Sequence, residues 1–200
     1  MPNAKLMPKI AARSIAGGML LMAFFTLMWS GIAVSGLNDA WSNTVLFIFV
    51  PLSLIVAANG AHLFVVSKNF PSLSTKSDKA QRKRMGIAYG VVFSAEAIFI
   101  GAGAGILGGL HKDAYIIPVI ALIVGLHFYP MAKVFRRTLD YYLATWVCLA
   151  ALIGVWQTRE GISTQAVSAM VGLATASATT VYGLYMWRIK HQALVELKHS

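Results

Sequence analysis

The chain has 200 residues, of which 58% are hydrophobic and 12% are charged, and its formal net charge is +10. Soluble proteins carry about 25% charged residues, so this composition excludes an ordinary soluble domain and indicates an integral membrane protein. Cys148 is the one cysteine, which excludes an intramolecular disulfide and a cysteine-rich metal site.

Six long apolar runs follow one another along the chain. Each is long enough to cross the hydrocarbon core of a bilayer, roughly 30 Å thick, as an α-helix of about 20 residues. The sequence therefore predicts an all-α, polytopic membrane protein in which residues 1–200 form a single six-helix transmembrane domain. The predicted spans are Ser14–Gly36, Trp41–Val66, Met85–Gly109, Tyr115–Ala132, Leu139–Trp156 and Thr164–Trp187.

The basic residues are distributed unevenly between the connections. Of the 17 Lys and Arg residues, all but Lys112 and Arg159 fall on the side that holds both chain ends. Cytoplasmic segments are enriched in Lys and Arg, so the pattern predicts an N-in/C-in topology. The longest connection, Ser67–Arg84, is polybasic and is expected to face anionic lipids. Because topology accounts for the positive charge, no nucleic-acid binding is expected.

Glu96 is the acidic residue closest to the middle of a predicted span. A carboxylate at that depth is costly, and such groups usually face the bundle interior or a water-filled cavity. Protonation, or pairing with a cation or hydrogen-bond donors, would lower the cost. Glu96 is therefore interpreted either as a proton- or cation-responsive group or as a structural carboxyl that holds helices together.

Three polar residues of the neighbouring spans are candidate partners of Glu96. Asn59 and His62 are three residues apart in the second span and share a helical face, and His127 lies in the fourth. If spans two, three and four meet, the four residues form one proton, cation or substrate site. Otherwise each histidine is a hydrogen-bonded packing residue. Pro51 and Pro130 are expected to kink their helices, because each leaves a backbone carbonyl without its usual partner.

Two spans carry stripes of small or polar residues. In the third span, the four-residue spacing of Ala97, Gly101, Gly105 and Gly109 predicts a packing seam, either inside the chain or between the chains of a homodimer. In the sixth span, one face carries a polar stripe that would form either interhelical hydrogen bonds or a hydrated wall. The stripe consists of Ser168, Thr175, Thr179 and Tyr182, with Gly172 among them.

Motifs of enzymes and metal sites are not found. The sequence lacks a Gly-x-Ser-x-Gly element, a zinc-binding helix and a glycine-rich phosphate loop. No cofactor and no metal are therefore expected. Whether the protein is an enzyme is left open, although the sequence favours a protein that is not one.

The segment 124–135, Val-Gly-Leu-His-Phe-Tyr-Pro-Met-Ala-Lys-Val-Phe, resembles the fourth-span signature of small, uncharacterised bacterial membrane proteins with six spans. The resemblance implies a compact protein of the bacterial cytoplasmic (inner) membrane and draws attention to His127 and Pro130. It implies no activity.

Together these observations favour a small transporter or channel-like protein, coupled to protons or cations, with Glu96 as the titrating group. The competing hypothesis is a membrane scaffold or accessory subunit that transports nothing. An intramembrane enzyme is the third.

Overall fold

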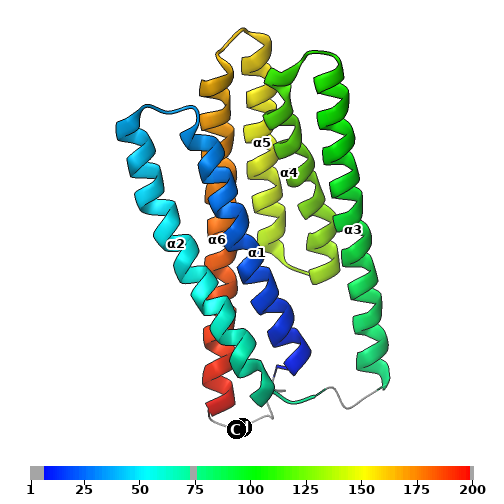
Figure 1. Ribbon diagram of the computed structural model, residues 1–200. Helices are drawn as coiled ribbons and strands as arrows, with labels where there is room; N and C mark the ends of the chain where they lie inside the picture. The colour runs from blue at the N-terminus through cyan, green and yellow to red at the C-terminus, as the bar shows by residue number, and fades with distance from the viewer. Residues whose placement is uncertain (1–6, 73–75, 199–200) are drawn as a thin grey trace.

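The computed structural model describes residues 7–72 and 76–198, and nearly all of these are helical. Six helices lie side by side in an elongated bundle (Figure 1). All six are long and apolar enough to cross a membrane, which confirms the predicted all-α fold with six helices of that kind. The helices are α1 (Lys9–Val34), α2 (Asp39–Val66), α3 (Lys76–Gly109), α4 (Ile116–Phe135), α5 (Thr138–Arg159) and α6 (Thr164–Lys198), with short 3-10 turns η1 (Ser67–Asn69) and η2 (Asp113–Tyr115). Lys5, one of the basic residues assigned to the inner side, lies outside the described ranges.

Two helices extend well beyond the apolar runs. Helix α3 begins at Lys76 rather than Met85, and α6 ends at Lys198 rather than Trp187. The prediction that Ser67–Arg84 is one long loop is therefore wrong, because the second half of that segment is helical. Lys, Arg, Gln, Ala, Leu and Glu make up most of the two extensions and have high helix propensity, so each helix continues beyond its apolar run.

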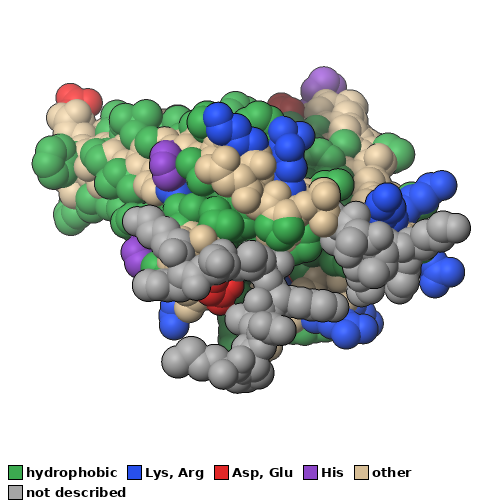
Figure 2. Space-filling view, turned by 90° about the horizontal axis from the view of Figure 1, so that it is seen from below, with side chains coloured by type: hydrophobic (Ala, Val, Ile, Leu, Met, Phe, Trp, Pro, Cys, Tyr) green, Lys and Arg blue, Asp and Glu red, His purple; other side chains and the backbone are tan. Residues whose placement is uncertain are grey.

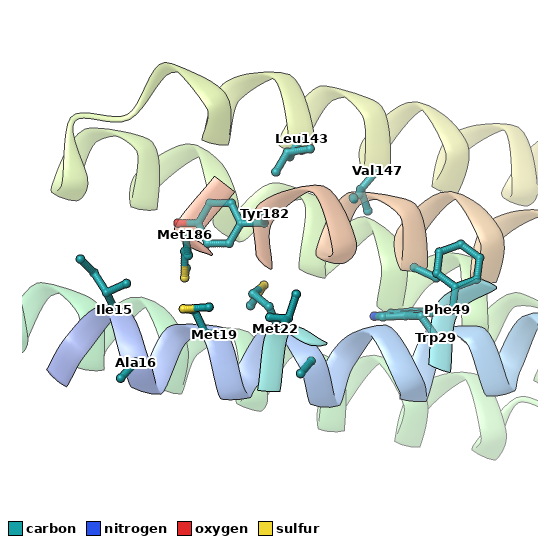
Figure 3. Close-up of a cluster of buried hydrophobic side chains, with 14 of the residues drawn as sticks. Ile15, Ala16, Met19, Met22, Trp29, Phe49, Leu143, Val147, Tyr182 and Met186 are labelled. Atoms are coloured by element: carbon teal, nitrogen blue, oxygen red, sulfur yellow. The ribbon is translucent and has the colours of Figure 1, made fainter. Parts of the chain in front are cut away.

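The helices pack in an arrangement that their order along the chain does not reveal. Helix α1 packs against α2 and α6, and α5 packs against α4 and α6, so α6 joins the two groups. The core contains buried side chains of α1, α2, α4, α5 and α6, and in Figure 3 Met19 and Met22 of α1 face Tyr182 and Met186 of α6. The core thus follows α6 along the bundle.

Helix α3 lies at the edge of the bundle (Figure 1). It packs against α4 and contributes no side chain to the core among the described residues. Only 6% of its candidate span is buried, against 67% for α6. Its position therefore depends mainly on one helix contact, that with α4.

Local interactions define several helix ends. The Asn38 side chain accepts a hydrogen bond from the Trp41 N–H at 3.1 Å, so it caps the start of α2. Helix α4 ends where Arg136 adopts a left-handed conformation, with φ 54° and ψ 46°. The short α4–α5 connection, residues 136 and 137, lies part-way along α6 rather than level with its end (Figure 1).

Candidate functional site

A carboxylate and an imidazole meet where α3 contacts α4. His127 Nδ1 lies 3.1 Å from Glu96 Oε1, and Glu96 is 8% exposed. Among the described residues, His127 Nδ1 has no hydrogen-bond partner of good geometry. The two groups are therefore close enough for an ion pair but are not aligned as a hydrogen bond. The structure therefore brings together two of the four residues that the sequence singled out.

Helix geometry explains how Glu96 comes to face α4. Glu96 and Gly103 are seven residues, or about two turns, apart on α3 and therefore share a face. A Cβ at Gly103 would touch the side chains of Val119 and Ile123 of α4 at 3.5 and 3.6 Å, so this face of α3 approaches α4 to ordinary van der Waals contact. The same approach places the Glu96 carboxyl against the His127 ring.

A second buried carboxyl, Asp140 of α5, was missed by the sequence reasoning. Asp140 is 0% exposed, and neither of its oxygens has a hydrogen-bond partner of good geometry among the described residues. Arg137, His127 and Tyr182 interact with it electrostatically. The Arg137 guanidinium in turn donates to the Tyr182 hydroxyl at 2.9 Å. His127 therefore contacts one buried carboxyl, Glu96 on α3, and interacts electrostatically with a second, Asp140 on α5.

The available sequence signal for Asp140 was its place inside the predicted fifth span. It was overlooked because it is the second residue of that span, where a charge is usually read as a boundary. It lies in the first turn of α5, where the helix dipole favours a negative charge. Asp140 therefore both complements the dipole of α5 and interacts electrostatically with His127.

The other two predicted partners of Glu96 lie elsewhere, so the four-residue cluster is not formed. Asn59 accepts a hydrogen bond from Lys190 Nζ at 2.7 Å, and His62 is exposed. The reason is the packing of the helices: α2 contacts α1 and α6, whereas α3 contacts α4. Spans two, three and four therefore do not meet at one point.

The small-residue ridge of α3 does not serve as a packing seam inside the chain. A Cβ added at Gly101, Gly105 or Gly109 would meet nothing within 4 Å, and Ala97 is exposed. The ridge is displaced by one residue, about 100° around the helix, from the face that carries Glu96. It therefore faces away from α4, and packing within one chain is excluded as its role.

The polar stripe of α6 is buried inside the bundle. Ser168, Thr175, Thr179 and Tyr182 are all at most 7% exposed. The Thr26 hydroxyl of α1 donates to Thr179 Oγ1 at 3.0 Å. This face therefore forms interhelical contacts and is not a hydrated wall.

The remaining features give no further chemical group to the site. Pro51 and Pro130 both lie inside continuous helices, α2 and α4. Within the described ranges, no three His, Cys, Asp or Glu side chains gather as they would around a metal ion. Two open hollows lie on the surface, and neither is lined by Glu96, His127 or Asp140.

Comparisons with protein-family models, with curated proteins and with solved structures find no match to this chain. The resemblance carried by residues 124–135 therefore remains a prediction. The fold is a bundle of six helices that are able to span a membrane. The site is a buried carboxylate–imidazole contact at the edge of that bundle.

Proposed function

We propose that this chain is a multi-pass protein of a bacterial cytoplasmic membrane, with both termini inside, and that it is a small proton-coupled transporter or channel-like protein. The observation that carries the proposal is the contact of Glu96 with His127 in the middle of apolar helices. A carboxyl and an imidazole in contact can hold a proton in two ways, as a charged pair or as a neutral pair, and exchange it with a cation or with water.

The position of α3 gives this proton a structural consequence. Because α3 packs against α4 and contributes nothing to the core, it can tilt or slide without opening the bundle. A charged Glu96–His127 pair attracts the two helices, whereas loss of either charge removes that attraction. Protonation would thus control the helix contact that holds α3.

Asp140 extends the site toward the predicted inner end. It lies at the start of α5, close to the basic α4–α5 connection, and interacts electrostatically with His127. In the proposed mechanism His127 exchanges its proton with Glu96 on one side and with Asp140 on the other. Arg137 and Tyr182 stabilise the Asp140 carboxylate after it releases the proton.

A scaffold or accessory subunit is the second candidate function. It is favoured by the exposed ridge Ala97, Gly101, Gly105 and Gly109, which would let the α3 of a second copy, or a helix of another membrane protein, approach closely. In that case Glu96 and His127 only hold α3 in place.

Proton flux in liposomes distinguishes the two functions. Liposomes that contain the purified protein and an internal pH dye are given a potassium diffusion potential, and proton entry is measured. The wild-type protein is expected to carry protons faster than empty liposomes do, and Glu96→Gln to fall to the rate of empty liposomes because the amide cannot exchange a proton.

Glu160→Gln is the matched control, since Glu160 is exposed at the end of α5. It should retain the wild-type rate. A correctly folded Glu96→Gln protein that carries protons as fast as the wild type would refute the coupling. If liposomes with the wild-type protein take up protons no faster than empty liposomes do, the transport proposal is refuted and the scaffold becomes the favoured function.

A further inference from the structure

A basic hollow lies at the end of the bundle where α1 and α3 begin. It has a volume of about 430 Å³ and is lined by Lys9, Ile10 and Arg13 of α1, by Ser72, and by Lys79 of α3. Among the residues whose side chains the structure describes, no acidic one lines it. Figure 2, which views the molecule from this end, shows Lys and Arg side chains gathered on the surface. The hollow therefore presents three positive charges from two helices.

Arg13 is held in one orientation. Its Nε donates to Ser67 Oγ at 3.3 Å, and its guanidinium carbon lies 5.4 Å from the centre of the Phe64 ring. Ser67 is itself buried and donates to the Phe64 carbonyl at 2.6 Å. The terminal N–H groups of Arg13 have no partner in the part of the chain that the structure describes. A guanidinium fixed in this way is preorganised to bind two oxygens of a phosphate.

The other groups around the hollow are fixed relative to Arg13. Lys9 precedes Arg13 by four residues, so the two side chains share a face of α1. The Lys9 N–H donates to the Pro71 carbonyl at 2.8 Å, which ties the segment that carries Ser72 to the start of α1. Lys79 reaches the same hollow from α3. The residues that line the hollow therefore come from three separate segments of the chain: α1, the segment with Ser72, and α3.

The depth of Arg13 matches the headgroup layer of a membrane. From Val34, the last residue of α1, to Arg13 is about 32 Å at about 1.5 Å per residue. The hydrocarbon core is roughly 30 Å thick and the headgroups extend beyond it. Ile10 in the hollow is 49% exposed, and Phe64 beside Arg13 is 52% exposed. These apolar surfaces can contact the acyl chain of a lipid whose headgroup occupies the hollow.

We propose that the hollow binds the phosphodiester headgroup of an anionic phospholipid. Arg13 binds two phosphate oxygens, Lys9 and Lys79 add positive charge, and the Ser72 hydroxyl donates a hydrogen bond. The bound lipid would connect α1, which belongs to the core, to α3, which otherwise packs mainly against α4. This inference does not depend on proton transport, because it concerns how α3 is held at its start.

The test measures lipid binding to the full-length protein in mild detergent by native mass spectrometry. The probes are phosphatidylglycerol, phosphatidylcholine and inorganic phosphate. Phosphatidylglycerol is expected to remain bound, and phosphatidylcholine is not. Arg13→Gln should weaken phosphatidylglycerol binding about tenfold, since a charge-assisted bidentate contact is lost.

Two further variants make the result independent of the folding of Arg13→Gln. Lys79→Gln should also weaken binding. The Lys79 side chain is exposed and does not belong to the core, so its replacement should leave the fold intact. Lys133→Gln, an equally exposed basic residue outside the hollow, should bind like the wild type.

Three outcomes would overturn the proposal. They are equal binding of the two lipids, equal loss of binding in Lys133→Gln and Lys79→Gln, and displacement of the lipid by millimolar inorganic phosphate. The last would show a site for free phosphate.

Discussion

At the scale of single residues, the molecule is defined by a few polar groups inside apolar helices. Glu96 and His127 pair with each other, and Lys190, 5% exposed, donates to the Asn59 amide oxygen. Buried ions usually require a partner, because removal from water costs several kcal/mol per ion. For Asp140, the nearby Arg137 on the adjoining connection offsets part of that cost.

The stability of the folded protein should depend on Asp140. Asp140→Asn keeps the shape of the side chain but leaves the Arg137 guanidinium without its neighbouring negative charge. We expect it to lower the free energy of unfolding by about 1–3 kcal/mol. Asp113→Asn, at an exposed position in η2, should change stability little. The unfolding midpoint in detergent measures both, and equal midpoints would show that Asp140 is not stabilised by its surroundings.

At the scale of elements, close backbone packing holds α1 against α6. Gly172 of α6 faces the backbone of Trp29 and Ala33 of α1. The two hydroxyls of Thr26 and Thr179 add a hydrogen bond at the same interface. Small residues and interhelical hydrogen bonds are the main attractive contacts where lipid surrounds a bundle, since apolar burial contributes little between helices there.

Gly172→Ala should weaken this contact. Its Cβ would lie 2.7 Å from the Ala33 nitrogen and 2.9 Å from the Trp29 carbonyl oxygen, and backbone atoms cannot move aside as a flexible side chain can. We expect a loss of about 1–3 kcal/mol in the free energy of unfolding. Gly101→Ala is the matched control, because nothing lies within 4 Å of its Cβ. If both substitutions had the same effect, the close α1–α6 packing would be disproved.

The outer face of α3 allows a prediction about association. If the ridge Ala97, Gly101, Gly105 and Gly109 contacts a second copy, Gly101→Leu should convert a dimer into a monomer. The substitution should leave the fold of each chain intact, because the added side chain meets nothing within the chain near its Cβ. Crosslinking in bilayers and single-molecule photobleaching would measure the change. A wild-type protein that is already monomeric in bilayers would rule out this role of the ridge.

At the scale of the whole molecule, the distribution of charge predicts how the bundle lies in the membrane. Lys9, Arg13 and the basic start of α3 lie at one end, whereas Lys112 and Arg159 belong to connections at the other. The positive-inside rule assigns the first end to the cytoplasm.

Cysteine labelling tests this orientation in a Cys148→Ala background. Asn69→Cys, at the predicted inner end, should react with a membrane-impermeant maleimide only after the cells are opened. Asp113→Cys, at the opposite end, should react in intact cells, and both positions are exposed in the structure. Labelling of Asn69→Cys in intact cells would reverse the topology.

The sequence by itself determined the six helices, because each hydrophobic run is a local property and a helix satisfies its own backbone hydrogen bonds. It also identified Glu96 and His127, since polar residues deep in apolar runs stand out without knowledge of their neighbours.

Which helices meet was decided only by the tertiary structure. Packing of α2 beside α1 and α6 separated Asn59 and His62 from Glu96. Packing of α3 on α4 left the small-residue ridge of α3 on the outside, and packing of α5 on α4 let Asp140 interact with His127. Hydropathy could not predict this, because helix pairing depends on the shapes of complementary faces far apart in the chain, whereas hydropathy reports only that most of each helix surface is apolar.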